Sequence, residues 1–139
     1  MDLNYKAIVV AAVAQFIFGA IWYMPIFGKV WGKIHGFDQV PPEKQKELMR
    51  GMWKWLVVQF LLTLVTTVVF AVLVTDVLPN WNIYSLAFLY WLGFMMPTQA
   101  AAVIFGGTKP EWIWAKIAIS IGASLACVEI IAVIFKWMM

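Results

Sequence analysis

The chain has 139 residues, of which 64% are hydrophobic and only 12% are charged, and its formal net charge is +3. A soluble domain is typically about 45–50% apolar and about 25% charged. Together with a mean hydropathy of +0.86, this composition excludes a soluble globular enzyme, a disordered protein and a nucleic-acid-binding domain. The protein is expected to lie in a lipid bilayer.

Four segments are long and apolar enough to be membrane-spanning helices, each of which needs roughly 20 residues to cross about 30 Å of hydrocarbon. They are predicted at residues 3–24, 53–75, 81–104 and 112–137. Pro25 is expected to end the first span, and Pro97 lies inside the third. The first span lacks the small-residue cleavage pattern of a signal peptide and is expected to be retained. We therefore predict an all-α integral membrane bundle of four helices, with residues 1–139 as one domain.

The segment between the first two spans, residues 26–52, is predicted to contain short helices. From Ile26 to Phe37, apolar residues share one helical face and lysines another. This pattern is typical of an amphipathic helix that lies in the membrane interface. Pro42 suits the first position of a second helix, which would continue to Arg50.

The lysines and arginines are unevenly distributed along the chain. Most belong to the two connecting segments and their flanks: Lys29, Lys33, Lys44, Lys46, Arg50, Lys54, Lys109 and Lys116. Only Lys6 and Lys136 belong to the other side. By the positive-inside rule, both connecting segments are expected in the cytoplasm and both termini outside. We therefore expect a multi-pass membrane protein whose partner is the lipid bilayer and not a nucleic acid.

Polar side chains inside the predicted spans need partners, because hydrocarbon offers none. With a rise of about 1.5 Å per residue, their depths suggest two layers. The layer toward the outer end would contain Glu129, Tyr90, Thr66 or Thr67, and Gln15. The layer nearer the cytoplasm would contain Gln59 and Gln99. Small residues at four-residue spacing mark faces for helix–helix contact, namely Ala118, Gly122 and Ala126 on the fourth span and Ala7, Ala11 and Gly19 on the first.

Glu129 is the most informative of these polar residues, because a carboxylate deep in a bilayer costs a few kcal/mol on insertion scales. It should be hydrogen-bonded or protonated. One interpretation is a proton-coupled or cation site, and the other is a structural hydrogen bond to Tyr90 or to a threonine hydroxyl.

Most tryptophans, Trp22 among them, fall near predicted span ends, which is typical of an interfacial aromatic belt. Trp91 lies deeper and is expected to pack in the core.

The reactive side chains are few. Cys127 and His35 are the only cysteine and the only histidine, so no Cys/His set for zinc, haem or an iron–sulfur cluster is expected. No nucleophile–base pair or carboxylate pair is found either. We predict no catalytic residue, no bound metal and no cofactor.

Two runs of residues resemble the signatures of a known family. The first, residues 18–31, and the second, residues 91–98, contain the signature positions Gly19, Trp22, Tyr23, Pro25, Phe27, Gly28, Gly93, Pro97 and Thr98. Together with the four-span layout, they resemble the DUF1761 family of small bacterial membrane proteins of unknown function. The resemblance implies the fold, a location in the bacterial cytoplasmic (inner) membrane and a shared role for these positions. It implies no activity, and Glu129 lies outside both signatures.

Three classes of function remain after these exclusions. A membrane enzyme is the weakest of them, because only Glu129 could serve as an acid or base, and two other classes are favoured. The first is a non-catalytic structural or accessory subunit that self-associates as a homo-oligomer or joins a larger membrane complex. The alternative is a small homo-oligomeric channel, or a proton- or cation-coupled transporter, that uses Glu129. Solute flux that depends on this carboxylate would favour transport. Loss of a partner after mutation of the small-residue faces would favour the subunit.

Overall fold

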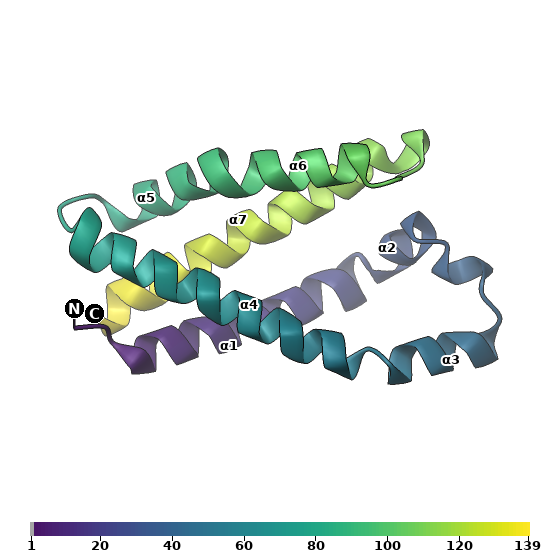
Figure 1. Ribbon diagram of the computed structural model, residues 1–139, viewed down its shortest axis with the longest axis horizontal. Helices are drawn as coiled ribbons and strands as arrows, with labels where there is room; N and C mark the ends of the chain where they lie inside the picture. The colour runs from purple at the N-terminus through teal and green to yellow at the C-terminus, as the bar shows by residue number, and fades with distance from the viewer. Residues whose placement is uncertain (1) are drawn as a thin grey trace.

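The computed structural model describes residues 2–139, which are helical without strands over that range. Four helices are long and apolar enough to cross a membrane, at Tyr5–Ile26, Trp53–Val77, Ile83–Phe105 and Pro110–Met138. They confirm the predicted all-α, four-span fold of a multi-pass membrane protein. Both termini lie at one end of the bundle (Figure 1), where the Asn4 side chain donates a 3.0 Å hydrogen bond to the carbonyl of Met138.

The first span consists of α1 (Tyr5–Ile21) and a π-helical turn, η1 (Trp22–Ile26). Pro25 was expected to end the helix, but it lies inside this wider turn, which tolerates a residue without an N–H donor. The next helix, α2 (Gly28–Ile34), is shorter than the predicted amphipathic helix. It ends early because Gly36 adopts a left-handed conformation with a φ of 71°.

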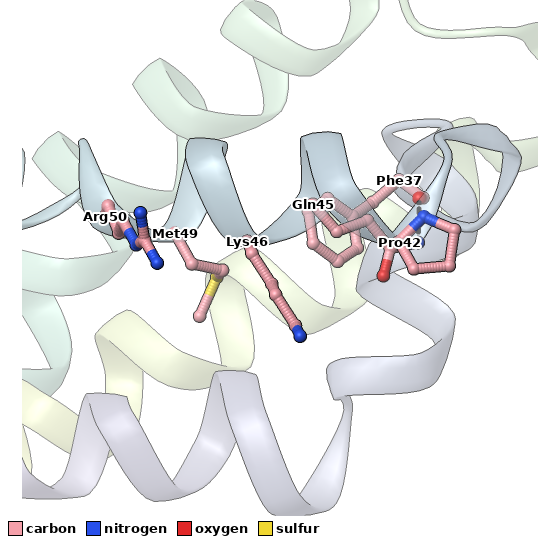
Figure 2. A pocket seen from close by; sticks show the side chains of 6 residues that line it. All are labelled: Phe37, Pro42, Gln45, Lys46, Met49 and Arg50. Atoms are coloured by element: carbon pink, nitrogen blue, oxygen red, sulfur yellow. Dashed lines mark hydrogen bonds between the residues drawn. The ribbon is translucent and has the colours of Figure 1, made fainter.

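A compact turn joins α2 to the helix that leads into the second span. It contains a short 3₁₀ segment, η2 (Phe37–Gln39), and is followed by α3 (Pro42–Arg50), with Pro42 at its first position as predicted. The side chain of Gln45 donates hydrogen bonds of 3.0 and 2.9 Å to the carbonyls of Phe37 and Val40. Figure 2 shows the side chains along one side of α3 that line an open cavity of about 510 Å³, with Phe37, Pro42, Gln45, Lys46, Met49 and Arg50 as its walls.

The second span is α4 (Trp53–Val72) with a π turn, η3 (Leu73–Val77). The third span comprises α5 (Ile83–Tyr90), a π turn η4 (Trp91–Met95) and α6 (Met96–Phe105). It begins two residues later than predicted because the Asn82 side chain caps it. The π turn directly precedes Pro97, whose missing N–H would interrupt a regular α-helix there.

The fourth span, α7 (Ile113–Met138), follows a short 3₁₀ turn, η5 (Pro110–Trp112). It is the central helix, because it packs against α1, α5 and α6, whereas α4 packs chiefly against α1. The contiguous core lies toward the termini and contains Ala7, Ile8, Ala11, Phe70, Ala71, Leu86, Ala87, Val128, Ile131, Ala132 and Phe135. We call the part of the bundle built on this core the terminal half. The loop half extends from there to the connecting segments 26–52 and 106–109. In this half α6 and α7 pack together, whereas α4 diverges from both (Figure 1).

Candidate functional site

A buried hydrogen bond between Gln15 and Thr67 joins the first two spans. The Gln15 amide donates to the Thr67 hydroxyl oxygen at 2.8 Å and to the carbonyl of Ala11 at 3.1 Å. Thr67 in turn donates to the carbonyl of Thr63 at 2.7 Å. Gln15 is 6% exposed and Thr67 is fully buried. This pair holds α1 against α4 where the helices cross.

The other members predicted for the outer polar layer do not join this pair. Thr66 donates to the carbonyl of its own helix at Leu62. The Tyr90 ring packs edge-on against Phe70, with 5.9 Å between the ring centroids. Glu129 is half-buried on α7, and no hydrogen bond joins its carboxylate to another side chain within residues 2–139. The layer predicted from depth is therefore one buried pair and three separate residues.

The predicted inner layer of Gln59 and Gln99 does not form. Gln99 instead accepts a 2.7 Å hydrogen bond from Ser124 on α7. The Trp91 indole donates to the Ser124 hydroxyl at 3.1 Å and to the carbonyl of Ile121 at 3.0 Å. Gln59 is exposed on the surface of α4. Similar depth on two helices does not bring side chains together when one of them points away from the bundle.

A second indole, from the first span, is bonded to α7 close to the first. Trp22 donates to the carbonyl of Ile119 at 3.0 Å. Its ring lies over Gly122, where an added Cβ would come within 3.3 Å of the Trp22 ring. Trp22 was predicted as part of an interfacial belt, whereas here it tethers two helices. The predicted small-residue face at Gly122 thus contacts the flat ring of Trp22.

The residues of the first signature run fold into one aromatic cluster around η1. The Trp22 ring contacts Phe18 and Phe27, with centroid distances of 5.5 and 4.7 Å. The Tyr23 ring contacts Trp31 at 4.8 Å. In the second run, the Thr98 hydroxyl donates a 2.7 Å hydrogen bond to the carbonyl of Phe94, within the widened turn before Pro97. At Gly19 and Gly93, by contrast, an added Cβ would meet nothing within 4 Å.

The comparisons with known proteins agree with this geometry. Residues 6–136 match the family described as Protein of unknown function (DUF1761). The chain belongs to this family. No curated protein and no solved structure matches it. The family membership confirms the resemblance found in the two signature runs, and the function must be inferred from the arrangement of the side chains.

In this DUF1761 protein, the polar groups inside the spans mainly join one helix to another. The Gln15–Thr67 pair connects α1 to α4, Trp22 connects η1 to α7, and the Trp91–Ser124–Gln99 network connects the third span to α7. Cys127 is a half-buried free thiol. Among residues 2–139, no group of three or more His, Cys, Asp or Glu side chains is placed to hold a metal ion.

Ser124 is the residue of this DUF1761 protein that the sequence reasoning missed. It accepts from Trp91 and donates to Gln99, so it links these two side chains of the third span to α7. A signal was present, since a serine within an apolar span needs a hydrogen-bond partner. The hydrogen bond that Trp22 donates could not be predicted from the sequence in this way, because its acceptor is a backbone carbonyl.

Proposed function

We propose that this protein is a non-catalytic membrane subunit that associates with a second copy of itself through the loop half of α4. The observation that carries the proposal is the exposure of Gln59 within a membrane-spanning helix. Every residue from 51 to 59 is exposed, and Gln59 lies six residues after Trp53, about 9 Å along the helix. At that depth an amide that faces lipid lacks a hydrogen-bond partner.

A second copy supplies a partner of the required chemistry. A glutamine amide carries both donors and an acceptor. A two-fold axis that runs along the bilayer normal and passes beside Gln59 places the two copies of this residue opposite each other. Two Gln59 side chains then form reciprocal hydrogen bonds, each donating to the other's carbonyl oxygen. Apolar side chains beside them, Leu56 and Leu62 among them, are 47% and 56% exposed and provide the surrounding contact.

The structural role is supported by how the remaining polar groups are used. Gln15, Trp22, Trp91 and Ser124 each form a hydrogen bond to another helix. Such bonds favour a fixed arrangement of helices over a site that exchanges ligands. Gln59 differs from these residues because its own bundle gives it no partner.

We also propose that both connecting segments lie in the cytoplasm and both termini outside, in the cytoplasmic membrane of a bacterium. The loop end of the bundle carries Lys29, Lys33, Lys44, Lys46, Arg50, Lys54, Lys109 and Lys116, whereas the terminal end carries Lys6 and Lys136. This difference supports the orientation by the positive-inside rule. A reporter enzyme active only outside the cytoplasm should be active when fused after residue 139. It should be inactive when inserted between residues 40 and 41. The opposite pattern of activity would refute the orientation.

Native mass spectrometry of the full chain, extracted from its membrane in mild detergent, tests the self-association. We expect a homodimer for the natural sequence and mainly monomer for Gln59→Leu, because leucine removes the amide but keeps an apolar side chain. Val57→Leu is the matched control, since Val57 is 52% exposed on a different face of α4, and it should leave the dimer intact. A monomeric natural protein, or a dimer unchanged by Gln59→Leu, would refute the proposal.

The same purified chain also tests the alternative function, a channel or transporter that uses Glu129. Proteoliposomes of the natural protein and of Glu129→Gln would be compared for proton and cation flux. We expect no flux above that of empty liposomes for either protein. Flux that Glu129→Gln abolishes would replace the subunit proposal with transport.

A further inference from the structure

A cavity of about 310 Å³ lies at the loop end, between the end of α2 and the turn that joins α6 to η5. Its walls include His35 from the first connecting segment, Thr108 and Lys109 from the second, and Lys116 from the first turn of α7. None of its lining residues is acidic. The cavity thus brings two lysines together from segments that the fold, and not the sequence, places side by side.

The ring of Trp31 contacts two of these side chains. The Lys116 ammonium lies 5.8 Å from the centre of the Trp31 ring, a cation–π arrangement. The His35 ring lies 4.6 Å from the same indole, and its Nδ1 donates to the carbonyl of Trp31 at 2.8 Å. This donation fixes the ring orientation and leaves Nε2 as the unused ring nitrogen.

Thr108 provides an independent sign that a ligand is needed. Its Oγ1 is buried and has no hydrogen-bond partner within residues 2–139. A buried hydroxyl without a partner is destabilising. Thr108 lies in the wall of the same cavity as the two lysines, so rotation of its side chain about χ1 would present the hydroxyl proton to an oxygen of a bound anion. The neighbouring Gly107, with a φ of 77°, makes the sharp turn that places Thr108 there.

The balance of charge around the cavity favours an anion. Two helices, α2 and α6, end nearby, and each helix C-terminus carries about half a unit of negative charge. Lys109 and Lys116 contribute two full positive charges to the wall of the cavity, whereas Glu111, two residues after Lys109, is not part of that wall. Phe105 and Trp114, which flank the turn, are 87% and 81% exposed. Exposed aromatic side chains of this kind lie at the level of lipid headgroups.

We propose that this cavity binds a phosphate group, supplied either by the headgroup of an anionic phospholipid or by inorganic phosphate. Lys109 and Lys116 provide the charge, and Thr108 donates a hydrogen bond to a phosphate oxygen. Charge-assisted hydrogen bonds of this type are stronger than neutral ones. A bound phosphate group would also connect the two segments of the chain that form the loop end.

The test uses the full chain in detergent micelles with three probes. Phosphatidylglycerol and diacylglycerol, which has no phosphate, are added separately, and retained lipid is measured by native mass spectrometry. Inorganic phosphate is titrated by calorimetry. We compare the natural protein with Thr108→Val, Lys109→Gln and the matched control Lys46→Gln, which removes the same charge from the exposed face of α3. Thermal unfolding without added phosphate or phospholipid should show Thr108→Val at least as stable as the natural protein, which separates lost binding from lost folding.

We expect at least one phosphate probe to bind, and Thr108→Val and Lys109→Gln each to weaken that binding about tenfold. Lys46→Gln should change it less than about twofold. Binding of phosphatidylglycerol alone identifies a lipid headgroup as the source, whereas binding of inorganic phosphate alone identifies the solution anion. Binding of neither probe would overturn the proposal. Equal retention of diacylglycerol, or an equal effect of Lys46→Gln, would overturn it as well.

Discussion

The two halves of the bundle are held together in different ways. In the terminal half, large side chains such as Phe70 and Phe135 are fully buried among alanines. In the loop half, α4 diverges from α6 and α7 (Figure 1), and the Trp22 indole donates to the backbone of α7. The Trp91 indole, which packs against the edge of the core, also donates to the backbone of α7. Lipid tails are as apolar as the side chains, so burial itself gives little driving force in a membrane. Close packing therefore stabilises the terminal half, and hydrogen bonds stabilise the loop half.

The difference between the halves explains where a second copy can bind. The terminal half of α4 buries Phe70 and Ala71 within the bundle, with the Phe70 ring against Tyr90 of α5 and Phe135 of α7. The loop half of the same helix is exposed over residues 51–59 and carries Gln59. At one end α4 packs inside the bundle. At the other end it is exposed and carries a polar side chain, Gln59, that has no partner in its own bundle.

The largest expected effect comes from removing a packed ring in the terminal half. Phe135→Ala should lower the free energy of unfolding by about 3 kcal/mol, because the cavity that remains has no atoms to fill it. Phe105→Ala is the matched control in the loop half. Phe105 is 87% exposed, so its truncation should change the free energy by less than about 0.5 kcal/mol. Unfolding in mixed detergent micelles measures both, and equal effects would contradict the comparison.

A smaller effect is expected from removing an indole tether in the loop half. Trp22→Phe keeps a ring but loses the hydrogen bond to Ile119 and part of the contact with Gly122. We expect a loss of about 1–2 kcal/mol in the free energy of unfolding. Trp53→Phe should have almost no effect, because Trp53 is 64% exposed and lies on a different face of α4 from Gln59. If both substitutions lower the free energy of unfolding equally, Trp22 is an ordinary interfacial residue and its hydrogen bond to α7 adds no stability.

The smallest effect is expected at the boundary between the halves. Thr67→Val removes the hydroxyl that accepts from Gln15, and hydrogen bonds inside membranes average about 0.6 kcal/mol. Thr66→Val, one residue away, removes a hydroxyl that bonds only its own helix and should be neutral. A double-mutant cycle of Thr67→Val with Gln15→Leu would isolate the pair. A coupling energy of zero would show that the bond adds no stability.

The sequence allowed the four spans and their approximate ends to be predicted, because hydropathy over some 20 residues depends only on local composition. It also indicated that Gln15 and Thr67 face the interior. The predicted inner layer of Gln59 and Gln99 was wrong, because depth along a helix does not define the direction of a side chain around it. The separation of Glu129 from Tyr90 has the same cause.

Two other features could not be predicted for physical reasons of their own. Trp22 fits the statistical pattern of an interfacial belt, yet its N–H reaches a backbone carbonyl of a helix 97 positions away in sequence. The cavity between His35 and Lys116 depends on how the connecting segments meet in space. In both cases the partner is determined by tertiary structure, and no local pattern encodes it.

The most direct test of the comparison is disulfide cross-linking of α4 in the native membrane. A single cysteine would be placed at Gln59 in the loop half or at Val69 in the terminal half, in each case with Cys127→Ala. Both positions are exposed. We predict oxidised dimers for Gln59→Cys and none above background for Val69→Cys. Equal cross-linking at both positions, or cross-linking at Val69 alone, would contradict the account that a second copy covers the loop half.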